Sequence, residues 1–227
     1  MIDETSDVPL THPRPEQLAN ALAHIGLGSD HSAQTRIIIY DDSKIRSSAR
    51  AWFLLHTHGI KNIAILDGGL AKWQRENRPI ETKAQSGKMA RAKANVPLVL
   101  SKPERFRYKQ DMLANIDTAT EHVVDARDTA RFNGDAEGSG HIPGSCNLPY
   151  PTLFNDDGTY KSPNDIDACF AQIGITPDKP VTATCGSGMT ACVLLFALHL
   201  IGRDNGALYD GSWTEWGSDP DTPKDKQ

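Results

Sequence analysis

The sequence has no long hydrophobic run and no recognisable export signal. Its longest apolar stretch, residues 191–201, is interrupted by His199 and is too short to span a bilayer. The first residues, Met1-Ile2-Asp3-Glu4, are acidic where a secretory signal peptide carries basic side chains. We therefore expect a soluble protein of the cytoplasm.

The chain also has no large excess of positive or negative charge. The 227 residues include 24 Lys and Arg and 29 Asp and Glu, which give a formal net charge of −5 at pH 7. A mildly acidic chain with both signs interspersed has no electrostatic footprint for nucleic acid and no polybasic patch for an anionic membrane. We expect neither nucleic acid nor a membrane among its partners.

Cysteine is scarce as well. The chain has four cysteines and no C-x-x-C pair, which does not indicate a disulfide framework. His56 and His58 have the wrong spacing for one helical face, and no cysteine or carboxylate nearby completes a zinc ligand set. The sequence predicts no metal and no cofactor, and nothing marks Cys146, Cys169 or Cys192 as reactive.

What the sequence does contain is an internal repeat. The matching segments are 15–27 with 163–175, 37–40 with 181–184, 47–58 with 189–201, and 65–73 with 208–216. Each copy has the order helix, strand, helix, strand and short helix, with Pro15 or Pro163 at the first helical position. Such alternation favours an α/β fold in which parallel sheets carry helices on both faces.

The second copy is longer than the first. Residues 121–148 are predicted to form a strand, a short helix and a Gly-rich loop, and the first copy has no counterpart of them. A parallel sheet without an interior strand would expose backbone groups, so we expect an N-terminally truncated version of a longer protein. The predicted division is a partial, non-catalytic domain (1–78), a linker (79–106) and a catalytic domain (107–227).

The best candidate for a reactive group is Cys185. It follows a predicted strand that ends at Thr184, and the loop Gly186-Ser187-Gly188 then leads into a helix. Small residues allow successive N–H groups to turn inward, and the helix N-terminus adds positive charge, so the loop favours a thiolate or a persulfide. The alternative is a buried structural cysteine at a tight turn. The equivalent residue of the first copy is Asp41, so only the second copy carries a nucleophile.

Several motifs of the chain carry a family resemblance. They are residues 124–127, 131–132, 140–144, 185–190 and 209–213 in the second copy, and 40–41 and 66–70 in the first. As a set they resemble the two-domain sulfurtransferases of the rhodanese superfamily, above all those that use 3-mercaptopyruvate. The resemblance implies two rhodanese-like domains, each a parallel-sheet core with helices on both faces, the first of them incomplete.

The active-site loop selects among the activities of this superfamily. Thiosulfate-preferring members carry basic residues just after the cysteine, whereas this chain has Gly186 and Ser187 there, as 3-mercaptopyruvate enzymes do. The resemblance implies that the loop binds substrate, and its remaining members are Gly188, Met189 and Thr190, with Met189 where the family usually has Val. Related phosphatases keep a C-x5-R loop, and the residue at that arginine position is Ala191, which argues against their chemistry.

The resemblance also implies roles for residues outside the loop. Ser187 joins His12 and Asp3 of the first domain to polarise the substrate and move protons. Arg131 anchors the substrate carboxylate, for which a bidentate guanidinium is suited. The family usually offers a second arginine before the segment 141–144, and residues 133–140 contain none.

The predicted activity is sulfur transfer from 3-mercaptopyruvate, through a persulfide on Cys185, to a thiol acceptor such as thioredoxin or to cyanide. No cofactor is required. Thiosulfate stays open as the donor because the second arginine is missing. A third possibility, from a different functional class, is a weakly active persulfide carrier or binding module.

Overall fold

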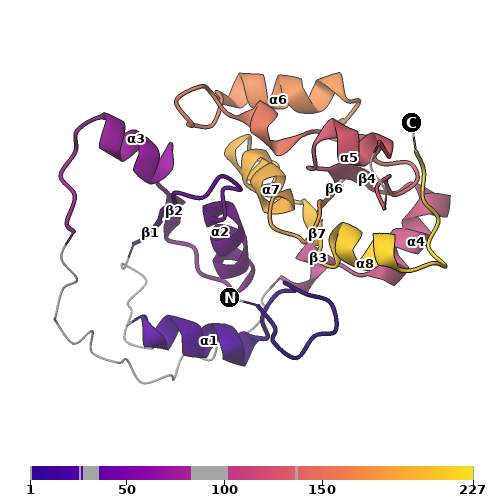
Figure 1. Ribbon diagram of the computed structural model, residues 1–227, viewed down its shortest axis with the longest axis horizontal. Coiled ribbons are helices and arrows are strands. Elements are labelled where there is room, and N and C mark those ends of the chain that lie inside the picture. Colours follow the sequence, from indigo (N-terminus) through magenta and orange to yellow (C-terminus); the bar gives the residue numbers. More distant parts are fainter. Residues whose placement is uncertain (1, 26, 28–35, 83–101, 136–137, 227) are drawn as a thin grey trace.

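The computed structural model describes residues 2–25, 27, 36–82, 102–135 and 138–226 (Figure 1). The elements of the first copy are α1 (Pro15–His24), β1 (Ile37–Ile39), α2 (Ser48–Thr57), β2 (Ile63–Ile65) and α3 (Gly69–Arg75). The second copy begins with a short 3-10 turn (Pro103–Arg105), β3 (Phe106–Arg107), α4 (Lys109–Thr118), β4 (His122–Asp125), α5 (Thr129–Asn133) and β5 (Cys146–Asn147). It continues with a second 3-10 turn (Tyr150–Leu153), α6 (Pro163–Gln172), β6 (Val181–Thr184), α7 (Ala191–Leu200), β7 (Ala207–Tyr209) and α8 (Ser212–Ser218).

Local sequence signals explain where the repeated helices begin and end. Pro163 stands at the first turn of α6, and the Ser162 hydroxyl oxygen accepts a hydrogen bond from the Asp165 N–H at 3.3 Å. Each of α2, α6 and α7 ends two residues before a glycine in the left-handed conformation, namely Gly59, Gly174 and Gly202. The repeat predicted from the sequence is confirmed element by element.

The strands form two parallel sheets. The larger has the order β3-β7-β6-β4-β5, with β6 at its centre, and the smaller pairs β1 with β2. Among the described residues β1 has one neighbouring strand, whereas β6, its counterpart in the repeat, is paired on both edges. The predicted α/β class with parallel sheets is confirmed. The predicted linker lies largely outside the described residues, so the domain boundaries stay a prediction.

The helices cover both faces of the larger sheet. On one face α7 is buried along its length from Ala191 to Leu198, and it packs against the sheet, α6 and α2 of the first copy. Figure 1 shows α2 and α7 side by side, and the Trp52 ring meets the edge of Phe196 at a centroid distance of 4.8 Å. On the other face Met112 of α4 and Trp216 of α8 form a second cluster. The two copies therefore share one hydrophobic core, which runs through α2 and α7.

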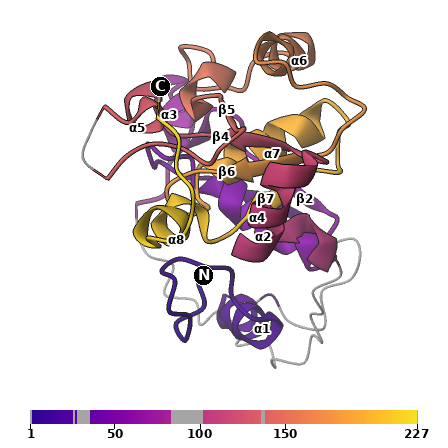
Figure 2. The same ribbon diagram turned by 90° about the vertical axis from the view of Figure 1, so that its right-hand side faces the viewer.

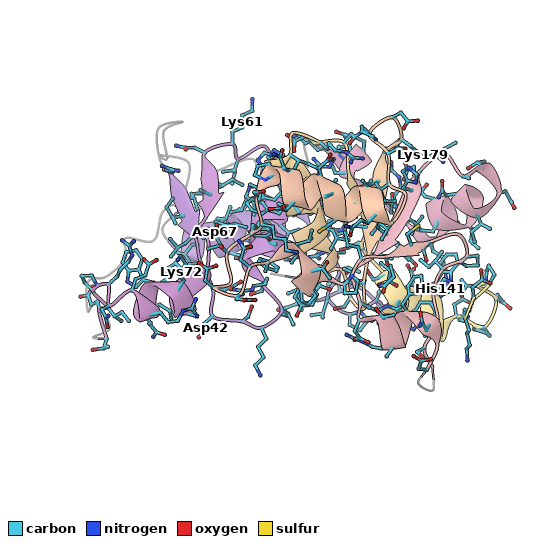
Figure 3. The ribbon with its side chains drawn as sticks, turned by 90° about the horizontal axis from the view of Figure 1, so that it is seen from above. Asp42, Lys61, Asp67, Lys72, His141 and Lys179 are labelled. Carbon is cyan, nitrogen blue, oxygen red and sulfur yellow. The ribbon has the colours of Figure 1, made fainter. Side chains whose placement is uncertain are left out.

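A polar contact joins the copies at another point. Asp67 of the first copy accepts a hydrogen bond from the Tyr160 N–H at 2.9 Å, and Lys72 forms an ion pair with Asp157 at 3.0 Å. Figure 3 shows Asp67 and Lys72 at the end of the molecule away from His141.

In the part of the chain that the structure describes, no helix has the length and apolarity needed to cross a membrane.

Candidate active site

The predicted site loop, Cys185 to Thr190, stands at the carboxyl end of the central strand β6 and leads into α7. The Ser212 hydroxyl oxygen accepts hydrogen bonds from the N–H groups of Cys185, at 3.3 Å, and Gly188, at 3.0 Å. That hydroxyl donates in turn to the Tyr209 carbonyl at 2.8 Å. The N–H of Trp213 also binds the Cys185 carbonyl at 2.9 Å. Hydrogen bonds to Ser212 and Trp213 at the start of α8 therefore fix the conformation of the loop.

This arrangement leaves some N–H groups of the predicted anion-binding loop unused by Ser212. Two of the loop's N–H groups are used by Ser212, so they are not available to a ligand. Within the described chain, the loop's N–H groups that take part in no hydrogen bond are those of Gly186, Ser187, Met189 and Thr190. Free backbone donors beside a helix N-terminus stabilise negative charge. Cys185 itself is only 2% exposed, so any charge on its sulfur lies in a largely dry setting.

The geometry of the loop requires a glycine at position 188. Its φ of +74° suits glycine, and a Cβ there would lie 2.8 Å from Arg50 Nη1 and 3.1 Å from the Asp210 carbonyl oxygen. The glycine at this position is therefore required by the backbone and by the space around it.

We predict that Gly188→Ala lowers kcat/KM for sulfur release by at least about tenfold, because about 1–2 kcal/mol of backbone strain adds to a clash that must move the loop or Arg50. Gly174→Ala is the matched control, since its φ of +79° gives the same backbone strain with no atom within 4 Å of the new Cβ. Steady-state assays and thermal unfolding of both variants test this. Equal activities of the two variants would show that the close approach of Arg50 is unimportant.

Arg50 links the loop to the first copy. This side chain of α2 is buried, and its Nη1 donates to the Gly188 carbonyl at 3.2 Å and to Asp210 Oδ1 at 2.9 Å. Its Nη2 donates to the Leu10 carbonyl at 3.0 Å. One guanidinium thus connects α2, the N-terminal segment, the cysteine loop and the segment before α8.

His12 is brought to the same place. Its backbone N–H lies 2.6 Å from Asp210 Oδ2, and its Nδ1 lies 2.8 Å from the same oxygen. The ring stacks on Phe106 with a centroid distance of 4.1 Å. Figure 2 shows the N-terminal segment, in indigo, directly beside α8. The predicted approach of this segment to the second copy is therefore present in the structure.

Asp3 has other partners in the structure. Its Oδ1 accepts hydrogen bonds from the Thr5 N–H at 3.0 Å, the Thr5 hydroxyl at 2.8 Å and the Gln17 side chain at 3.0 Å. These bonds, that of the Thr5 backbone first, lower the pKa of Asp3 to about 2. The carboxylate that contacts His12 is that of Asp210, and a catalytic role for Asp3 stays a prediction.

The remaining predicted residues lie at the same edge of the sheet as Cys185. Arg131 belongs to α5, which follows the carboxyl end of β4, and β4 pairs with β6 in parallel. Its guanidinium is more than half exposed and is paired with Asp128. Ser187 is half-buried, and its hydroxyl makes no hydrogen bond within the described residues. The structure leaves both side chains available to a substrate.

Neighbouring groups have structural roles. Arg127 is buried, pairs with Asp125 at 2.6 Å, donates to the Gly140 carbonyl and stacks under the Trp213 ring. Cys192 is fully buried below the loop, and burial raises the pKa of its thiol to about 12. This thiol lies 3.2 Å from the Gly188 carbonyl, to which it donates. The sequence likewise did not mark Cys192 as reactive. No group of three metal-ligating side chains occurs in the described ranges.

The comparisons with known proteins fit this geometry. A family model for the rhodanese-like domain matches residues 9–76 and 109–219. The chain belongs to the rhodanese-like family. The 3-mercaptopyruvate sulfurtransferase of Escherichia coli strain K12 is 37% identical, over 97% of this chain and 77% of the relative. The thiosulfate sulfurtransferase of Gallus gallus is 32% identical, over 94% of this chain and 73% of the relative. The crystal structure of SseA from Escherichia coli superposes with a TM-score of 0.80 at 36% identity, covering 93% of this chain and 78% of that one.

Family membership confirms the resemblance drawn from the motifs and the enzyme class, a sulfurtransferase. Within this rhodanese-like chain only the second copy carries the thiol. In the first copy Asp41 takes the equivalent place, and its carboxylate accepts a hydrogen bond from the Ser48 N–H at the start of α2. A side chain of the first copy therefore occupies the N-terminus of the helix that follows its strand.

Sequence reasoning missed Arg50 and Asp210. Asp210 lies inside the motif 209–213 that carried the resemblance, so its place in the chain was flagged although no role was assigned to it. Arg50 had no signal, because it lies on a helix of the other copy and meets the loop only through packing between the copies.

Proposed function

We propose that this sulfurtransferase takes sulfur from 3-mercaptopyruvate, holds it as a persulfide on Cys185 and releases pyruvate. The observation that carries the proposal is the loop after β6. A thiol stands at its first residue. Within the described residues, the loop's N–H groups that take part in no hydrogen bond, and so can bind negative charge, are those of Gly186, Ser187, Met189 and Thr190. The similarity to the 3-mercaptopyruvate sulfurtransferase of Escherichia coli supports this choice of donor.

The first half-reaction begins with attack of the Cys185 thiolate on the sulfur of 3-mercaptopyruvate. A sulfur–sulfur bond forms, the carbon–sulfur bond of the donor breaks, and its electron pair passes to the enolate of pyruvate. The proton of the donor thiol passes to the enolate carbon, which becomes pyruvate, and the new persulfide is left as an anion. The step therefore needs a group that takes the proton from the thiol and delivers it to the enolate.

His12 and Ser187 are proposed to carry this proton and to polarise the carbonyl of the donor. His12 is fixed beside the loop by Asp210, and the Ser187 hydroxyl has no protein partner among the described residues. Asp3 is the acidic member that the family resemblance implies. Arg131 is proposed to bind the donor carboxylate, in place of its exposed contact with Asp128.

Gly186, Gly188, Met189 and Thr190 are proposed to line the donor site through the backbone of the loop. In the second half-reaction the thiolate of an acceptor, or cyanide, attacks the outer sulfur of the persulfide. The bond from that sulfur to Cys185 breaks, and the Cys185 thiolate is restored. Thioredoxin as the acceptor and the cytoplasm as the compartment are predictions that rest on the sequence.

Thiosulfate is the second candidate donor. One specific feature favours it: residues 133–140 contain no arginine to give a carboxylate a second cationic partner. The similarity to the thiosulfate sulfurtransferase of Gallus gallus points the same way. The uncharged Gly186 and Ser187 argue against it, because a doubly charged donor is better bound by a loop with cationic side chains.

We predict that kcat/KM for 3-mercaptopyruvate exceeds that for thiosulfate by at least about tenfold, a preference of about 1.4 kcal/mol. Sulfur release from each donor to cyanide, measured at steady state, tests this. A preference for thiosulfate would mean that the charge of the loop does not select the donor. If the protein turned over neither donor while Cys185 was still rapidly alkylated, the result would favour a persulfide carrier over an enzyme.

A further inference from the structure

The contact between His12 and Asp210 joins the N-terminal segment to the segment before α8, 198 residues away. Asp210 is 2% exposed, and its Oδ2 meets both the backbone nitrogen and Nδ1 of His12, at 2.6 and 2.8 Å. Phe106 stacks against the ring of the histidine. The imidazole is therefore held by a hydrogen bond and a ring stack, and the backbone of the same residue is bound to the same carboxylate oxygen.

The charge of this carboxylate determines which ring nitrogen carries a proton. Burial by itself would raise the pKa of Asp210, but the hydrogen bond from His12 and the charge of Arg50 hold it below its usual value. An ionised carboxylate only accepts hydrogen bonds, so the Nδ1 of His12 must be the donor. In the neutral ring Nε2 is then the nitrogen without a proton.

The two oxygens of Asp210 have separate tasks. Oδ1 accepts from Arg50, which also donates to the Gly188 carbonyl in the cysteine loop, while Oδ2 serves His12. The histidine and the loop are thus positioned relative to each other through one buried ion pair.

We propose that Asp210 is the positioning residue of His12: it fixes the imidazole with Nδ1 protonated and Nε2 free to exchange the proton of the sulfur-transfer step. This inference rests on the proposed function for its effect on turnover, and on the hydrogen-bond geometry together with the charge of Asp210 for the tautomer.

The neighbours of the pair do not offer a second orienting carboxylate. Asp210 is surrounded by His12, Arg50, the thiol of Cys192 and the phenol of Tyr108. Near His12 the further titratable group is His58. Among the described residues Asp210 is the carboxylate that pairs with the His12 ring.

The test compares Asp210→Asn with Asp204→Asn. Asp204 forms the same kind of pair, 2.7 Å from Nδ1 of His199, but beyond the far end of α7. We expect Asp210→Asn to lower kcat by about 10- to 100-fold with KM changed less than about threefold, as for other residues that orient a reacting group. Asp204→Asn should leave both unchanged.

A double-mutant cycle separates positioning from a structural role. In the His12→Gln background, Asp210→Asn should cause less than about a twofold further loss of kcat, because its target is already gone. An equal loss in both backgrounds would overturn the proposal. A loss of kcat in Asp3→Asn, with Asp210→Asn unaffected, would assign the orienting role to Asp3 instead.

Nitrogen NMR of ¹⁵N-histidine-labelled protein gives a readout that does not depend on turnover. The ring signal assigned by His12→Gln should show a protonated Nδ1 in the wild type, and Asp210→Asn should change it. An unprotonated Nδ1 in the wild type would overturn the inference even in an active enzyme. A protonated Nδ1 in a chain that releases sulfur from neither donor would leave the geometry standing and reject the proposed function.

Discussion

Replacing Cys185 by serine should abolish sulfur release from 3-mercaptopyruvate, with kcat/KM falling by at least about a thousandfold. A serine hydroxyl is not ionised near neutral pH, and it cannot hold a transferable sulfur atom as a persulfide. The side chain is 2% exposed and differs from serine in one atom, so the fold should be retained.

Two measurements check this result. The rate of pyruvate formation should vanish in Cys185→Ser, and mass spectrometry after incubation with the donor should find one added sulfur atom in the wild type only. Cys169→Ser is the control, because this half-buried cysteine lies on α6, outside the site loop. Persulfide on the Cys185→Ser variant, or its loss on Cys169→Ser, would contradict the assignment of the nucleophile.

Replacing Arg50 by alanine should remove about 3–5 kcal/mol from the free energy of unfolding. The substitution leaves the Asp210 carboxylate buried without its cation, and it also frees the carbonyl groups of Leu10 and Gly188. Because the pKa of Asp210 is lowered in the folded protein, this stabilisation is present above the unfolded value of about 4 and is lost as the pH falls through the folded value.

Urea denaturation at pH 7 and near pH 3 measures the effect. Arg78→Ala is the matched control, since Arg78 pairs with Glu76 on the surface, where such pairs contribute less than about 1 kcal/mol. Equal losses for the two variants at pH 7 would mean that the buried pair does not hold the copies together. A difference that persists undiminished at acid pH would show that the effect of Arg50 does not depend on the charge of Asp210.

Much of the fold could be predicted because its signals are local. Pro163 and Gly174 bracket α6, the run Val181–Thr184 has strand character, and the alignment of the two copies gives the same order twice. The same holds for the loop that begins at Cys185, since a small-residue segment between a strand and a helix is visible in the sequence. The period of the apolar residues and the turn chemistry determine such elements without reference to distant parts of the chain.

The surroundings of the thiol could not be predicted in this way. The sequence indicated that His12 belongs to the site, but it offered Asp3, nine residues away, as the acidic partner, whereas the ring pairs with Asp210. Asp3 instead finds partners close by in Thr5 and Gln17. Nearness in sequence is a poor guide for His12, because its partner Asp210 belongs to the other copy and meets it only through packing between the copies.

The sequence by itself determined the repeat, the α/β class, the family and the single copy that has a cysteine directly after its central strand, since these follow from residue type and spacing along the chain. Only the tertiary structure decided that Arg50 of one copy and Asp210 of the other meet under the cysteine loop, 160 residues apart. The physical reason is the shared core of α2 and α7. Its burial places the two charges side by side out of water, where an unpaired charge would be costly.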